Sequence, residues 1–177
     1  MNRLVKALSP LIITGAAITC AHAEATPVQQ QLDVALYKDG HQIAMGTSII
    51  KDEIVGKAPY AMRSGTEIGY GRCTKVGNTK VGNATSLASD SVFVGLAMFI
   101  DPVVVDGTRA QLSVSVQDTE FVGKHEDGPA DCGSETVSTK GLKVNKVIVD
   151  IADGQSIDVP LGDTHYRLAL KLHNADL

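Results

Sequence analysis

The sequence predicts an all-β protein, namely an antiparallel β-sandwich or partly open barrel of roughly seven to nine strands with one disulfide. Three Asp-Gly pairs, at 39–40, 106–107 and 153–154, each separate two apolar runs. Asp-Gly favours the two-residue turn of a β-hairpin because both residues tolerate positive φ. No stretch beyond position 23 keeps a helical apolar period for three turns. That part of the chain has a suitable length for one domain with a single core.

Each Asp-Gly pair predicts one hairpin. The joined runs are 32–36 with 43–45, 99–105 with 112–116, and 147–151 with 157–161. The segment His165–His173 also alternates strictly. Its apolar side chains predict a C-terminal strand with one face in the core and the other in water, the inward residues being Tyr166, Leu168, Leu170 and Leu172.

Other segments are less regular. The run 92–100 is apolar without alternation, which is typical of a central strand covered on both faces or of a strand whose outer face meets a partner. We favour the central strand and expect a β-bulge at Gly95. Apolar positions change from even to odd between Leu142 and Ile151, which predicts a bulge near Asn145–Lys146. Lys-Val-Gly-Asn occurs at 75–78 and 80–83 and predicts a glycine-rich hairpin tip around Gly77 and Gly82.

The first 23 residues have the layout of a secretory signal peptide. Arg3 and Lys6 precede an apolar run over 7–18, and Ala21-His-Ala places small residues where signal peptidase cleaves, before Glu24. An uncleaved anchor is the alternative, but the run is short for a bilayer span. A lipoprotein reading of Cys20 does not fit the residues before it. We therefore expect a signal peptide over 1–23, a single β-sandwich domain over 24–177, and a periplasmic or secreted location.

The charge balance argues against two classes of ligand. Cleavage would remove two basic and no acidic residues, so the formal charge would move from −4 to −6. Nucleic acid and anionic membranes both require a concentrated basic surface. We expect neither as the partner, and we expect no transmembrane segment in the processed chain.

Two cysteines, Cys73 and Cys132, remain after processing. In an oxidising compartment an even number of cysteines predicts a disulfide. This bridge would staple an acidic surface loop, His125–Ser134, to the region of Cys73. A redox-active pair would usually have Cys-x-x-Cys spacing, and a metal site would need further ligands.

The sequence contains no catalytic constellation, and we expect no cofactor. The serines at Ser64 and Ser134 lack the frame of a nucleophile elbow. Paired carboxylates stay possible, with Asp90, Asp101 and Glu120 as equal candidates. Because function concentrates on loops carried by rigid sheets, we expect binding at the glycine-rich tip and at the acidic loop, whose candidate residues are His125, Glu126, Asp127 and Asp131. The alternative for this loop is a weak divalent-cation site.

Two segments carry a resemblance over essentially the whole chain. With Leu32-Asp-Val-Ala-Leu-Tyr-Lys-Asp-Gly and Gly65-Thr-Glu-Ile-Gly-Tyr, the sequence resembles small exported proteins of Gram-negative proteobacteria that have no assigned activity. The stretch 96–172 is similar in strand rhythm to the β-domain of outer-membrane secretins, through Asp101-Pro and Asp153-Gly-Gln. It lacks the secretin signature that would follow, and the chain is too short for the periplasmic repeats.

Three functions agree with these observations. The first is an exported binding or structural module of the envelope or secreted surface, accessible to antibodies and serving a protein partner. The second is a hydrolase whose carboxylate or metal chemistry is hidden in the linear sequence. The third is an accessory subunit of a secretion or outer-membrane assembly, which would expose the apolar strand 92–100 in the monomer.

Overall fold

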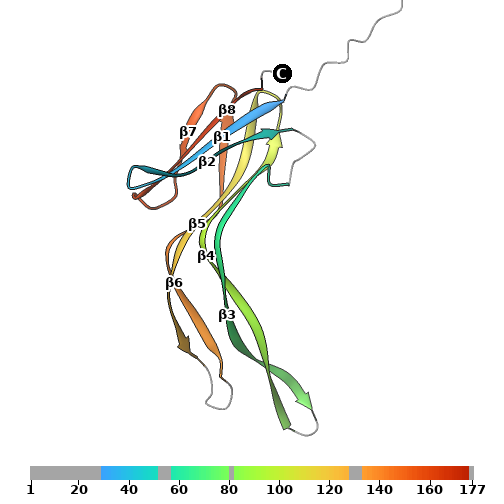
Figure 1. The fold of residues 1–177 in the computed structure, drawn as a ribbon. Helices are drawn as coiled ribbons and strands as arrows, with labels where there is room; N and C mark the ends of the chain where they lie inside the picture. Colours follow the sequence, from blue (N-terminus) through green and yellow to red (C-terminus); the bar gives the residue numbers. More distant parts are fainter. Residues whose placement is uncertain (1–28, 52–56, 80–81, 128–132, 176–177) are drawn as a thin grey trace, which may run out of the picture.

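The computed structural model describes residues 29–51, 57–79, 82–127 and 133–175, and every regular element among them is a β-strand. Eight strands form two antiparallel four-stranded sheets that are separate and open (Figure 1). This confirms the predicted β-sandwich. The bounds are β1 Gln30–Lys38, β2 His41–Ile50, β3 Tyr60–Thr79, β4 Gly82–Val105, β5 Arg109–Glu126, β6 Glu135–Ala152, β7 Ser156–Val159 and β8 Tyr166–Asn174. The predicted signal peptide lies outside the described residues.

Two of the three predicted hairpins are confirmed. Sheet A has the strand order β2-β1-β8-β7, and sheet B has the order β3-β4-β5-β6. The β1–β2 turn holds Asp39 at φ 50° and Gly40 at φ 79°, the positive angles that Asp-Gly tolerates. Asp106-Gly107 also joins β4 to β5, with Gly107 at φ 80°. This connection includes Thr108, and of Asp106 and Gly107 only the glycine has positive φ.

The prediction of a third hairpin at Asp153-Gly154 is wrong. The turn is present, with Gly154 at φ 73°, but it carries the chain from β6 in sheet B to β7 in sheet A. The Gly154 amide donates to the carbonyl of Leu172 at 2.8 Å, and β7 then pairs with β8. The turn therefore connects the two sheets because its backbone bonds to β8.

The predicted bulge in β6 is confirmed, whereas the predicted bulge at Gly95 is wrong. Val114 pairs with Val147 and Val116 with Val144, so Asn145 and Lys146 lie together opposite Ser115. Gly95 stays in register with both neighbouring strands. Glycine is needed at this position because the backbone of β3 lies too close for a side chain, as described below.

The core lies between the two sheets. Its residues from sheet A come from alternate positions of β1 and β8, as in Leu32 and Leu170. In sheet B, the core residues occupy only one end of the strands and stop at a common level. They lie within residues 60–62, 96–105, 110–116 and 142–151. β4 is central in sheet B, but only one of its faces meets sheet A. Phe99 on the other face is 39% exposed, so the expectation of cover on both faces is wrong.

A row of small residues crosses sheet B where the core ends. Gly65 pairs with Gly95, Gly95 with Thr119, and Thr119 with Gly141. A Cβ on Gly95 would lie 2.4 Å from the carbonyl oxygen of Ser64, and one on Gly141 would lie 2.2 Å from that of Asp118. Both glycines have positive φ, at 133° and 119°. The glycine row, Gly65–Gly95–Thr119–Gly141, thus lets neighbouring backbones approach more closely than side chains would permit.

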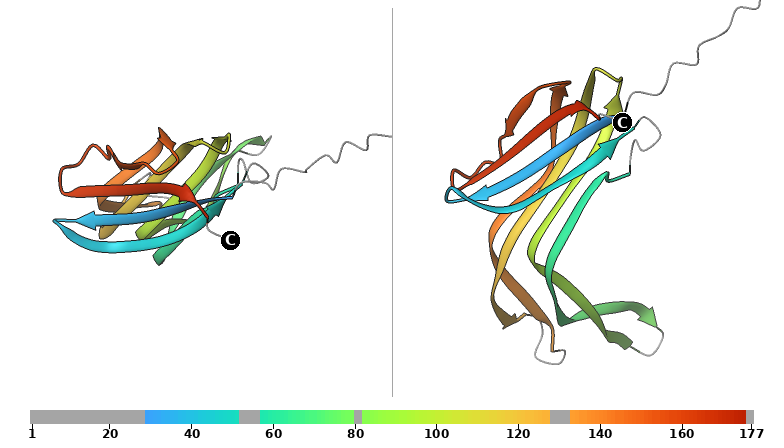
Figure 2. Two further views of the ribbon diagram at one scale, coloured as in Figure 1. Left: turned by 90° about the horizontal axis from the view of Figure 1, so that it is seen from above. Right: turned by 45° about the horizontal axis from the view of Figure 1, so that its top comes forward.

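Beyond the glycine row, sheet B divides. The last β4–β5 pair is Gly95 with Thr119, while the pairing of β3 with β4 and of β5 with β6 continues. Figures 1 and 2 show two separate hairpins that extend past sheet A and end far from it.

Replacing Gly95 by valine tests the glycine row. The Gly95→Val protein should lose about 3 kcal/mol or more of unfolding free energy, because a strained φ and a backbone clash add. Gly123→Val is the matched control, since a Cβ there meets nothing within 4 Å. Urea unfolding of both variants measures the difference. Equal midpoints would show that the row is not under steric constraint.

Candidate functional site: the two hairpin arms

The part of sheet B beyond the glycine row consists of two arms. The β3–β4 arm is residues 66–94, and the β5–β6 arm is residues 120–140. None of the described residues in either arm belongs to the core cluster. The arms are therefore held by their own strand pairing, and both of their faces are available to other molecules.

Apolar side chains and balanced charges share the surface of the arms. Leu87 is 63% exposed on one arm, and Val122 is 56% exposed on the other. The charged groups pair across strands: Arg72 with Asp90 at 3.9 Å, Lys124 with Glu135 at 3.3 Å, and Lys140 with Glu120 at 3.2 Å. Exposed pairs of this kind add little stability. Their effect is to neutralise these six groups, while the exposed Glu126 and Asp127 leave the end of the β5–β6 arm acidic.

The end of the β5–β6 arm contacts the middle of the β3–β4 arm. The Gly71 amide donates to Oε2 of Glu135 at 3.5 Å, and the Cys73 amide donates to Oγ of Ser134 at 3.4 Å. A groove runs between the arms at this point, lined from one side by Tyr70 and Val92 and from the other by Thr136 and Val137, among other residues. These two hydrogen bonds are long, so they add little stability by themselves. The predicted Cys73–Cys132 disulfide would join the two arms at the same place.

The sequence-predicted binding loop lies at the end of the β5–β6 arm. His125 and Glu126 belong to β5, so the prediction that the loop begins at His125 is wrong; the strand continues because both residues pair with β6. The Asp127 amide donates to the carbonyl of Ser134 at 2.8 Å, and its Oδ2 accepts from Thr136 Oγ1 at 3.3 Å.

Two other predicted residues, Asp131 and Cys132, lie outside the described residues, so the disulfide with Cys73 stays a prediction. Ser134 places the chain that follows Cys132 directly against Cys73. Among the described residues, no three His, Cys, Asp or Glu side chains gather where they could hold a metal ion. The described part of the chain also contains no apolar helix of membrane-spanning length.

The glycine-rich tip lies at the end of the β3–β4 arm. Thr79 pairs with Gly82 there, and Gly77 lies two residues before the end of β3. The structure thus places the two predicted binding segments on separate arms at the same end of the molecule (Figure 1). The three candidate carboxylates are divided among different parts of sheet B: Asp90 on one arm, Glu120 on the other, and Asp101 beside the core.

A polar cluster that sequence analysis missed joins the base of the arms to sheet A. Asp118 lies next to Thr119 of the glycine row. Its Oδ2 accepts from the Tyr166 hydroxyl at 2.6 Å and from Lys38 Nζ at 2.9 Å. Nearby, at the same end of sheet A, His165 Nδ1 lies 2.7 Å from Asp39 Oδ1. Three strands of both sheets therefore meet at one carboxylate.

The titration of Asp118 reflects two opposing effects. Burial raises its pKa, but hydrogen bonds from Tyr166 and Lys38 outweigh burial, and the net pKa lies below the usual value. The pKa of Tyr166 is raised, first by burial and then by Asp118. The sequence could have predicted this cluster. Asp118 continues the alternation of inward-facing residues Leu112, Val114 and Val116, so its carboxylate is expected to point inward. A carboxylate in that register requires partners when it is buried.

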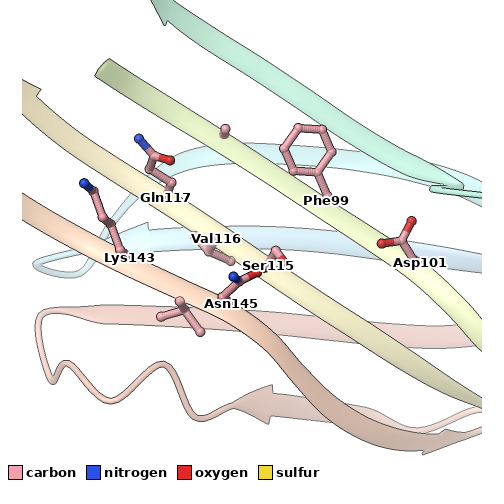
Figure 3. Close-up of a pocket in the computed structure, with 9 residues that line it drawn as sticks. Phe99, Asp101, Ser115, Val116, Gln117, Lys143 and Asn145 are labelled. Carbon is pink, nitrogen blue, oxygen red and sulfur yellow. Dashed lines mark hydrogen bonds between the residues drawn. The ribbon is translucent and has the colours of Figure 1, made fainter. Parts of the chain in front are cut away.

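A shallow hollow lies on the outer face of sheet B, opposite the core (Figure 3). Phe99 forms one wall, with Ser115 and Gln117 beside it and Lys143 and Asn145 on the far side. Gln117 Nε2 donates to the Phe93 carbonyl and to Thr119 Oγ1, both at 2.9 Å. This amide therefore supports the backbone at the glycine row from the outer face.

In comparisons with known proteins, no protein-family model, no curated protein and no solved structure matches the chain.

Replacing Asp118 by asparagine tests the cluster at the base of the arms. A carboxylate with a lowered folded-state pKa stabilises the protein above its unfolded pKa, near 4, and this stabilisation is lost as pH falls through the folded pKa. Asp118→Asn should cost about 1–3 kcal/mol at pH 7 and progressively less below about pH 4. Chemical unfolding at several pH values measures both effects. The control is Asp158→Asn, which removes an exposed pair with Arg167; a cost independent of pH would contradict the assignment.

Replacing both Cys73 and Cys132 by serine tests the predicted disulfide. A bridge closing a loop of about 60 residues is credited with roughly 4 kcal/mol, so the melting temperature should fall by roughly 10 °C. Thermal unfolding measures this fall, with reduced wild type as the second comparison. Free thiols that titrate in oxidatively purified protein would exclude the bridge.

Proposed function

We propose that this protein is an exported binding module that engages a protein partner through its two hairpin arms. One observation carries the proposal: sheet B continues past the core in two arms whose described residues make no contribution to the core cluster. Ordering a strand costs conformational entropy. The arms add little packing that could offset this entropy cost. A role in binding another molecule would explain why the chain keeps them.

The surface chemistry of the arms favours a protein as the partner. Leu87, Phe121 and Val122 are exposed among hydroxyl groups and paired charges. Such a mixture of apolar and neutral polar groups is typical of non-obligate protein interfaces. The sequence signal for export places the partner in the envelope or outside the cell, where the projecting arms would also be accessible to antibodies.

Site-specific photo-cross-linking tests this proposal in the producing cell. Benzoylphenylalanine at Leu87 or Val122 should give a discrete protein adduct in the envelope or medium fraction. Ile148 is the matched control because it is 52% exposed but lies on the core side of the glycine row. An equally strong adduct from position 148, or no adduct from either arm, would contradict recognition by the arms.

A further inference from the structure

We propose that the free edge of β3 in the β3–β4 arm binds an extended, uncharged segment of another protein, which adds to sheet B as a further strand. This inference rests on the proposed function and names the kind of partner. Strand addition needs an edge with unpaired backbone groups, room for the incoming side chains, and no device that repels a strand. Between Gly65 and Tyr70, β3 meets all three conditions. Further along, the outward amides of Gly71 and Cys73 are already bonded to the β5–β6 arm.

Two hydrogen bonds fix the direction of the backbone amides along β3. The Gly71 and Cys73 amides point away from β4, toward Glu135 and Ser134. In an antiparallel pair this direction alternates from one residue to the next, and the β3–β4 register is unbroken from Tyr60 to Val76. The amides of Glu67 and Gly69 therefore also point outward. No hydrogen bond within the described structure reaches either of them.

The face of the arm beside this edge is unusually bare. Gly69 pairs with Ser91, and Gly71 pairs with Ser89. A Cβ on Gly69 would come no closer than 4.0 Å to another atom, and its φ is not positive. The fold thus has no steric need for glycine at position 69. A strand glycine without such a need often marks a place where another backbone approaches.

Larger side chains border the bare face at both ends. Phe93 covers Gly65, so it lies on this face of the arm. Leu87 and the Gly133 carbonyl of the other arm cover Gly71, which leaves the open part of the face at Gly69. An incoming strand would place bulky apolar side chains over Gly69 and Ser91, between Phe93 and Leu87. The charges along β3 already have partners, with Arg63 paired to Glu67 and Arg72 to Asp90. An uncharged segment therefore suits this edge better than a charged one.

The opposite edge of sheet B carries protection that β3 lacks. β6 has lysines at 140, 143 and 146 and a bulge at Asn145–Lys146. Lysines and bulges are common devices against unwanted strand pairing. Between Gly65 and Cys73, β3 contains no lysine, no proline and no register shift. This asymmetry disfavours pairing of β3 with β6 of a second copy. Pairing with β3 of a second copy would bring Gly69 and Gly71 to the bare face instead of bulky side chains. A segment from a different protein is therefore favoured.

The first experiment measures binding of a defined probe to the purified chain. The probe is a fluorescein-labelled, end-blocked peptide of about seven residues in which threonine alternates with valine and phenylalanine. Saturable anisotropy is expected below about 1 mM for wild type and for the control Asp158→Asn, which lies in β7 outside the arms. Gly69→Val, which fills the bare face, and Gly69→Pro, which removes one outward amide, should weaken binding about tenfold or more.

Each result decides for or against the proposal. Gly69→Val should keep the wild-type urea midpoint, so its loss of binding would not reflect unfolding. The same peptide with alternate amides methylated should not bind. Absence of saturable binding to wild type, or unchanged binding to both Gly69 variants, would overturn the proposal. A wild-type dimer in light scattering that Gly69→Pro dissociates would also overturn it, because the occupant would then be a second copy.

A cross-linker at Thr66, beside the β3 edge, separates this inference from the proposed function. Adducts from Thr66 and Val122 together support both. An adduct from Val122 alone leaves the binding function standing and removes the strand site. No adduct from any arm position removes the proposed function itself.

Discussion

The close approach of backbones at the glycine row is the constraint on which the rest of this structure depends. At this level β3, β4 and β6 each contribute a glycine, while β5 contributes the buried Thr119. On one side of the row, sheet B is continuous and packs against sheet A. On the other side β4 and β5 separate. The row therefore marks the boundary between a protein core and a pair of projecting hairpins.

Polar contacts hold this boundary in place from both faces. On the inner face, Asp118 accepts hydrogen bonds from Lys38 and Tyr166 of sheet A. On the outer face, Gln117 donates to Thr119 and to the backbone of β4. Sequential residues of β5 thus point to opposite faces and bind different strands. These contacts fix the base of the arms, and a second contact joins the arms further out, where Gly71 and Cys73 meet Glu135 and Ser134.

The core and the arms differ in what their side chains do. The sandwich buries the apolar core, to which the described arm residues do not contribute. The arms carry paired charges, exposed leucine and valine side chains, and a strand edge on which the amides of Glu67 and Gly69 point outward. The proposed binding function rests on this presentation of extended strands by the core.

The features that the sequence predicted correctly are those that neighbouring residues decide. Short segments are enough to predict the Asp39-Gly40 turn, the alternation of β8 and the bulge at Asn145–Lys146. Turn geometry and side-chain direction depend on local backbone angles. The location of the candidate binding segments at the ends of hairpins was predicted as well. Their presence on long arms was not, because strand length past the core leaves no periodic apolar signal.

Only the tertiary structure decided which strands pair and where backbones touch. Asp153-Gly154 has the sequence of a hairpin turn, yet the Gly154 amide donates to Leu172 of β8, and the turn passes between sheets. Gly95 looked like a bulge, but its glycine is required by Ser64 and Gly65 of the neighbouring strand. Asp118 found partners 80 and 48 residues away. Turns and alternation are local properties of the chain, whereas these contacts join distant residues and exist only once the sheets have packed.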